Sequence, residues 1–111
     1  METLERAVIE ALASSEGAVG QILLEQHARA SVLRRDWSGV GVNTYFSVPA
    51  DAPRVETTEN PIGRPILIDL EGLKEGASAV MWIEAGALDS LEIFTFDEPW
   101  PEHPVITGIS G

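Results

Sequence analysis

The chain has 111 residues, with 18 acidic and 7 basic side chains and a net charge of −11 at pH 7. It contains no cysteine, which excludes disulfides, thiolate catalysis and cysteine-ligated zinc or iron–sulfur centres. The excess of carboxylates repels nucleic-acid phosphates and anionic membranes, and it favours a basic protein partner. At this length we expect residues 1–111 to form a single domain.

The beginning of the chain has no feature of a targeting segment. Met1 to Arg6 contain no basic region followed by a long apolar run, and no later stretch reaches the roughly 18 apolar residues of a membrane span. We therefore expect a cytoplasmic protein.

Two N-terminal segments have helical periodicity. The first repeats apolar residues at Leu4, Ala7, Val8, Ala11 and Leu12. This spacing predicts one apolar helix face, and a second helical segment is expected over residues 18–26. The sequence leaves open whether the two segments are one broken helix or two.

Five strands are expected after the helices, over residues 30–37, 40–48, 66–70, 77–83 and 88–96. The second strand alternates, with an apolar face that includes Phe46 and a more polar face that includes Asn43 and Tyr45. The last strand is apolar on both faces, which predicts a central or doubly covered position. The order of segments predicts an α+β fold, with one or two N-terminal helices packed on a mainly antiparallel sheet of about five strands.

Two connections have distinctive features. Residues 49–65 contain four prolines, and such length without structure indicates either a functional loop or a crossing connection. Residues 84–86 fit a type I turn with Gly86 in the left-handed region. Arg29, Arg34 and Arg35 fall in one short window, and we expect them to pair with carboxylates on neighbouring strands.

The C-terminal segment after the fifth expected strand is acidic and rich in proline. Seven acids and no Lys or Arg occur from Glu75 to Gly111. Trp100 lies between two prolines and cannot occupy the middle of a strand. It either plugs an apolar groove of its own domain or anchors a partner. The residues expected to bind that partner are Asp97, Glu98, Trp100, Glu102 and His103.

No catalytic constellation is present. There is no nucleophile elbow, and Gly39-Val40-Gly41 lacks the third glycine and the flanking elements of a dinucleotide fingerprint. His103 has acidic neighbours, but their spacing matches no recognised metal-ligand pattern. We therefore expect no metal and no cofactor.

The run from Leu91 to Pro101, together with the stretch from Trp37 to Pro53, resembles small uncharacterised bacterial proteins with an acidic tail of the Glu-Pro-Trp-Pro type. The resemblance covers about half of the chain and implies no activity, cofactor or catalytic residue. Some small acidic bacterial proteins of this kind are immunity or antitoxin partners, which is an analogy.

Three functions follow from these observations. The leading hypothesis is a non-enzymatic domain that binds a basic protein through the C-terminal segment and one sheet face. The alternative is a small-molecule or catalytic site built from Asn43, Tyr45 and Asp69 and covered by residues 49–65. The third is an obligate homo-oligomer formed through a sheet face or an edge strand.

Overall fold

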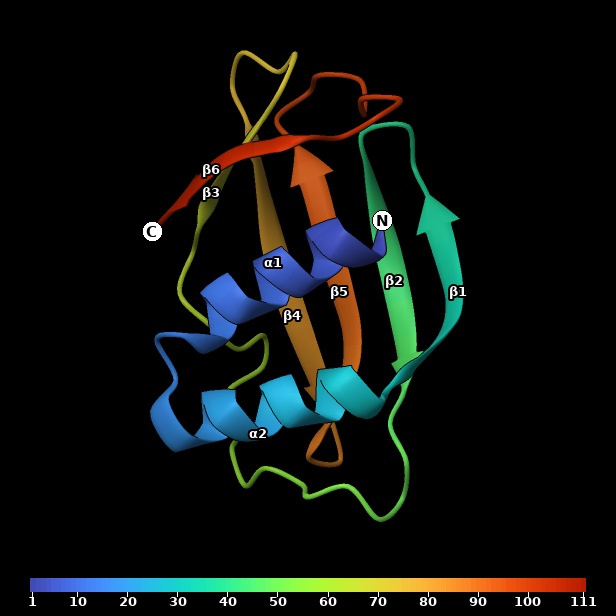
Figure 1. The fold of residues 1–111 in the computed structure, drawn as a ribbon, viewed down its shortest axis with the longest axis vertical. Coiled ribbons are helices and arrows are strands. Elements are labelled where there is room, and N and C mark those ends of the chain that lie inside the picture. Colours follow the sequence, from blue (N-terminus) through green and yellow to red (C-terminus); the bar gives the residue numbers. More distant parts are fainter.

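The computed structural model describes residues 1–111 and has an α+β fold, as the sequence predicts. Two helices, α1 (Glu2–Ala13) and α2 (Gly17–Arg29), lie side by side across one face of an antiparallel sheet (Figure 1). They are two separate helices. They approach closely because α2 carries Gly20 where it meets α1: a Cβ at that position would lie 2.0 Å from the carbonyl oxygen of Ala13.

The sheet has six strands in the order β1-β2-β5-β4-β3-β6. Their bounds are β1 Ser31–Trp37, β2 Gly41–Ser47, β3 Leu67–Leu70, β4 Ala77–Glu84, β5 Ala87–Thr95 and β6 Ile106–Ser110. Every neighbouring pair is antiparallel. β5 lies between β2 and β4, so the central position predicted from its two apolar faces is confirmed.

The sixth strand, β6, was not expected from the sequence. It contains only five residues and follows a proline-rich segment. Its partner is β3, where Asp69 lies opposite Gly108. β6 is short and partly exposed, and its partner β3 is far away in the sequence. Such a strand lacks the strict alternation by which strands are recognised in a sequence.

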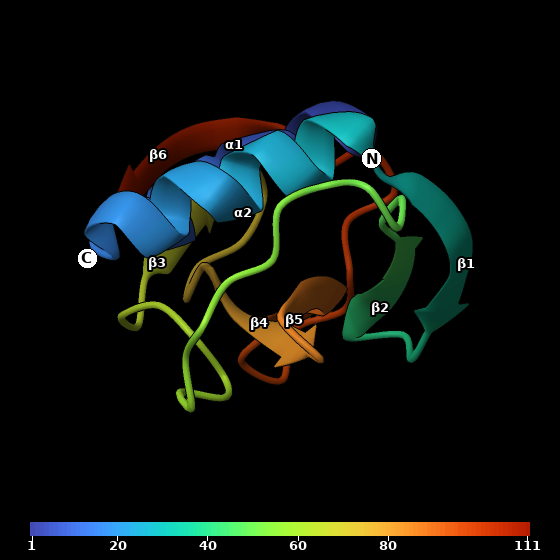
Figure 2. The same ribbon diagram turned by 90° about the horizontal axis from the view of Figure 1, so that it is seen from below.

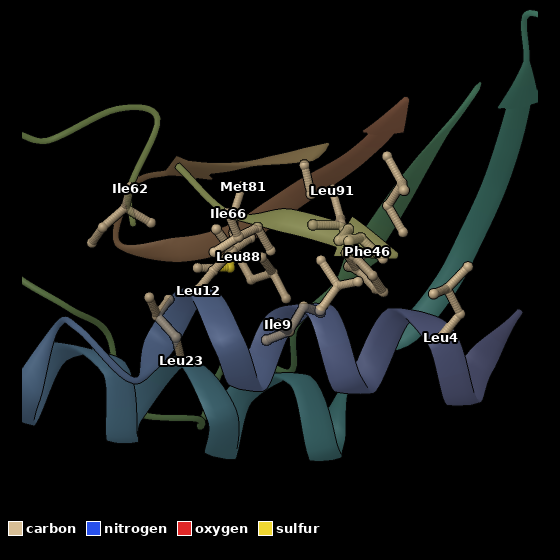
Figure 3. Close-up of a cluster of buried hydrophobic side chains, with 14 of the residues drawn as sticks. Leu4, Ile9, Leu12, Leu23, Phe46, Ile62, Ile66, Met81, Leu88 and Leu91 are labelled. Carbon is tan, nitrogen blue, oxygen red and sulfur yellow. The ribbon is translucent and has the colours of Figure 1, made fainter. Parts of the chain in front are cut away.

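The core fills the space between the helices and the inner face of the sheet (Figure 3). Ile9, Leu12 and Leu23 from the helices meet Met81 and Leu91 from the central strands, all five almost fully buried. Along β4, residues alternate between buried and more exposed positions. This alternation places one set of side chains against the helices and the other set on the opposite face.

Residues 49–65 form a crossing connection that is fastened to the rest of the domain. The side chain of Gln26 is fully buried. Its Nε2 donates hydrogen bonds to the carbonyls of Pro53 and Gly86 at 2.7 and 3.0 Å, and its Oε1 accepts one from the Leu88 N–H at 2.8 Å. These three bonds tie α2 to the connection and to the β4–β5 turn. Figure 2 shows the connection crossing this end of the molecule between α2 and the sheet.

The β4–β5 turn differs from the expected type I turn. It has two residues, Ala85 and Gly86, with φ angles of 51° and 77°. Two positive φ angles are the requirement of a type I′ turn, whose twist matches that of the strands it joins. The left-handed conformation expected of Gly86 is confirmed, but the expected type I turn was wrong because Ala85 also has a positive φ.

A buried ion pair joins α1 to the sheet. The Glu5 side chain is 1% exposed, and its carboxylate accepts hydrogen bonds from Arg35 Nε and Nη2 at 3.1 and 2.7 Å and another from the Thr44 hydroxyl. Arg29 and Arg34 also pair with acids, namely Asp51 and Asp36. All three arginines thus have acidic partners, but none of these partners lies on a neighbouring strand.

Candidate protein-interaction surface

The C-terminal segment, residues 96–105, crosses the end of the sheet between β5 and β6 (Figure 1). The backbone N–H of Trp100 donates a hydrogen bond to the carbonyl of Gly39 at 2.8 Å. The Thr95 hydroxyl donates to the Glu98 carbonyl. The segment is therefore fastened to the β1–β2 turn and to the end of β5.

Trp100 is half-buried and packs against the core. Its ring lies edge-on to Trp37, with centroids 6.3 Å apart and planes inclined by 64°. Trp37 is 55% exposed, so it is the more accessible indole of the pair. Sequence reasoning did not select Trp37, although its position at the end of a strand beside a Ser-Gly turn was a usable signal.

Glu98 has an internal partner on each carboxylate oxygen. Oε1 and Oε2 accept hydrogen bonds from the backbone N–H groups of Lys74 and Glu75 at 3.0 and 2.8 Å. These two donors, that of Glu75 first, lower the pKa of Glu98 because they favour the charged carboxylate. Glu98 thereby clamps the C-terminal segment to the β3–β4 turn.

The remaining expected contact residues of the segment, Asp97, Glu102 and His103, are exposed. Glu102 and His103 line a groove of 620 Å³ between this segment and the beginning of α1, and Trp37 lines its other side. No cluster of three or more His, Asp or Glu side chains in the chain is arranged to hold a metal ion.

The sheet has a second face that no helix covers. Figure 2 shows both helices on one side of the sheet. On the other side, the register aligns Arg34, Tyr45, Ser90 and Trp82 in one row across β1, β2, β5 and β4. We call this side the open face. It has a shallow hollow of 480 Å³ lined by Tyr45, Ser90 and Trp82.

The rim of this hollow is acidic. Glu84, Asp89 and Glu92 line it, together with Asn43 and Asn60, and no basic side chain does. The four ion pairs of the chain involve Glu10, Asp51, Asp36 and Glu5. The three rim carboxylates are therefore without a cationic partner.

A guanidinium already lies on this face, next to the hollow. The Arg34 guanidinium carbon is 4.0 Å from the centroid of the Tyr45 ring, and its Nε donates to Asp36 at 3.3 Å. The Asp36 side chain raises the pKa of Arg34 through this hydrogen bond.

The alternative ligand site expected from the sequence is only partly assembled. Asn43 and Tyr45 line the hollow, but Asp69 does not. β5 and β4 separate β2 from β3 in the sheet, which corresponds to about 14 Å across the strands. Of residues 49–65, only Asn60 reaches the hollow; its side chain bonds the N–H and the carbonyl of Ile83 at 3.0 and 2.8 Å.

A second hollow, of 370 Å³, is lined by Glu5, His27 and Phe46. Burial lowers the pKa of His27, whose ring is edge-on to Phe46 at 5.5 Å. The Glu5 carboxylate already bonds Arg35 and Thr44. These bonds hold α1 on the sheet.

The sequence matches no protein-family model, no curated protein and no solved structure at a significant level. Neither helix has the length and apolar character that a membrane crossing requires.

Proposed function

We propose that this chain is a non-enzymatic domain that binds a basic protein partner. The observation that carries the proposal is the open face, where half-exposed aromatic side chains lie among carboxylates without cationic partners. Trp82 is 38% exposed, and Tyr45 lines the same hollow. Accessible aromatic side chains within a polar rim are typical of protein interfaces.

The charge of the chain supports the same partner class. A net charge of −11 accelerates the approach of a basic protein and disfavours acidic competitors. The C-terminal segment supplies further exposed groups, Asp97, Glu102 and His103, at the end of the sheet beside the half-buried Trp100. Glu98 contributes by holding the segment in place.

By analogy with small acidic immunity and antitoxin proteins, the proposed partner is a basic protein that this domain covers and inhibits. The analogy rests on the resemblance of the C-terminal segment.

The test is a pull-down from native-host lysate at moderate salt, read by mass spectrometry. The baits are the wild type, Trp100→Ala, and the double variant Asp97→Lys/Glu102→Lys. Glu25→Lys, which changes an exposed residue of α2, is the control with the same type of charge reversal.

We expect a basic protein to be retained by the wild type and by Glu25→Lys, and to be lost with both C-terminal variants. Equal retention of the partner by all four baits would mean that the C-terminal segment is not part of the interface. No specifically retained protein would contradict the proposed function.

A further inference from the structure

The open face contains one slot between two aromatic side chains. Tyr45 on β2 and Trp82 on β4 both lie opposite Ser90 on β5. Two strand spacings separate the aromatic residues, roughly 9 to 10 Å. A flat group stacked between two rings needs about 7 to 8 Å. The small side chain of Ser90 leaves this space unfilled.

The floor of the slot has a free hydrogen-bonding group. Ser90 is only 6% exposed, yet no hydrogen bond within the protein engages its hydroxyl. The residue lines the hollow, and no side-chain oxygen or nitrogen sealed inside the protein lacks a partner. The Ser90 hydroxyl therefore opens into the slot, where it can accept a hydrogen bond from an incoming donor.

The neighbouring position in the same row shows which chemistry fits beside these rings. Arg34 lies against Tyr45 from β1, with Asp36 as its carboxylate partner. The slot on the other side of Tyr45 has a second ring, Trp82, and nearby carboxylates that include Glu92. It has the same combination of aromatic ring and carboxylate, but it has no cation.

We infer that this slot receives an arginine side chain of the protein partner. The inference rests on the proposed function and names the recognition element of that partner. A guanidinium is planar, stacks on aromatic faces and donates several hydrogen bonds. Stacked between Tyr45 and Trp82, it would donate to Ser90 and pair with Glu92. The ammonium group of lysine is not planar, so it cannot stack between the two rings in the same way.

The test uses short capped peptides as probes and the indole N–H signals of the ¹⁵N-labelled protein. The chain has three tryptophans, and each indole signal is assigned with the Trp→Phe variant. The probes are acetyl-Gly-Arg-Gly-amide and the same peptide with Lys or Gln in the middle. Free L-arginine is a fourth probe.

We expect the arginine peptide to shift the Trp82 indole signal saturably, with roughly millimolar affinity for a single side chain. The lysine peptide should bind at least about threefold more weakly, and the glutamine peptide should cause no saturable shift. Glu92→Gln and Asp89→Asn, combined, should weaken arginine binding about fivefold or more. Glu25→Gln is the control and should leave it unchanged.

Three outcomes would overturn the inference. The first is an equal shift of the Trp37 or Trp100 indole, and the second is equal binding of the glutamine peptide. The third is tighter binding of free L-arginine than of the capped peptide, which would indicate a small-molecule site. If the arginine peptide fails while the pull-down retains a partner, the proposed function stands and the slot does not serve it.

A blocked slot provides an independent variant. Ser90→Leu fills the space between the two rings and should abolish the Trp82 shift. Because Ser90 is buried, the folding of the Ser90→Leu variant is checked by circular dichroism. If this variant misfolds, Glu92→Gln with Asp89→Asn still decides the question, since both residues are on the rim.

Discussion

The two faces of the sheet are built by the same strands but have different chemistry. On the covered face, β4 and β5 present aliphatic side chains such as Met81 and Leu91, both fully buried. On the open face, the alternate residues of these strands include Trp82 and Glu92. The difference shows that only one face of these strands is needed to stabilise the fold, because no helix covers the other face.

The largest expected effect comes from changing one residue on each face. Leu91→Ala should lower the free energy of unfolding by about 3–4 kcal/mol, because it leaves a cavity in the core. Trp82→Ala should lower it by less, about 1–2 kcal/mol, because the indole is 38% exposed and leaves no enclosed cavity. Urea unfolding followed by circular dichroism measures both. A loss at Trp82 as large as that at Leu91 would mean that the open face is also structural.

A second, smaller effect is expected at the ion pair that holds α1 over the covered face. Glu5→Gln removes the charge that Arg35 pairs with, and a partly buried guanidinium is left without its carboxylate. We expect a loss of about 2–3 kcal/mol in the free energy of unfolding. Glu10→Gln, at an exposed pair of the same helix, is the matched control and should cost about 0.5 kcal/mol or less. Similar losses in the two variants would refute a special role for Glu5.

The clamp at Glu98 can be tested through the pH dependence of folding stability. Its folded-state pKa is lowered by two backbone donors, so the charged form stabilises the fold. This contribution is complete above the unfolded-state pKa and is lost as pH falls through the lower folded-state value. Wild type should therefore lose more stability than Glu98→Gln between about pH 5 and pH 3. Parallel thermal-unfolding curves for the two proteins over this range would contradict the clamp.

The smallest expected effect concerns His27, on the covered side. Burial lowers its pKa from the usual 6.5, so the folded protein binds its proton less readily than the unfolded chain. Stability should fall slightly as pH decreases through the unfolded-state pKa, and His27→Gln should reduce this fall. An NMR titration of the His27 ring measures the pKa directly. A value above 6.5 would disprove the role of burial.

Much of the covered face was predictable because it depends on local periodicity. The apolar spacing from Leu4 to Leu12 predicted α1, and the two-sided fifth strand predicted a central position. Strand β6 was missed because its pairing with β3 depends on distant residues. The turn type at Ala85 was missed because a non-glycine residue seldom adopts positive φ.

The open face could be predicted only in part. Asn43 and Tyr45 were selected from the polar side of one strand, and they do line the hollow. Asp69 was selected as an acid on an otherwise apolar strand, and it lies beyond two other strands. The row of Tyr45, Ser90 and Trp82 depends on the strand order β2-β5-β4, which strand periodicity does not determine. For the same reason, Trp82 was not assigned to a face.

The alternation along β4 and β5 also has an evolutionary consequence. Side chains on opposite faces of a strand share few contacts, so their substitutions combine almost additively in the free energy of unfolding. Positions such as 43, 82 and 92 can therefore change while the helix-facing residues stay the same. One stable scaffold can in this way carry open faces of different chemistry.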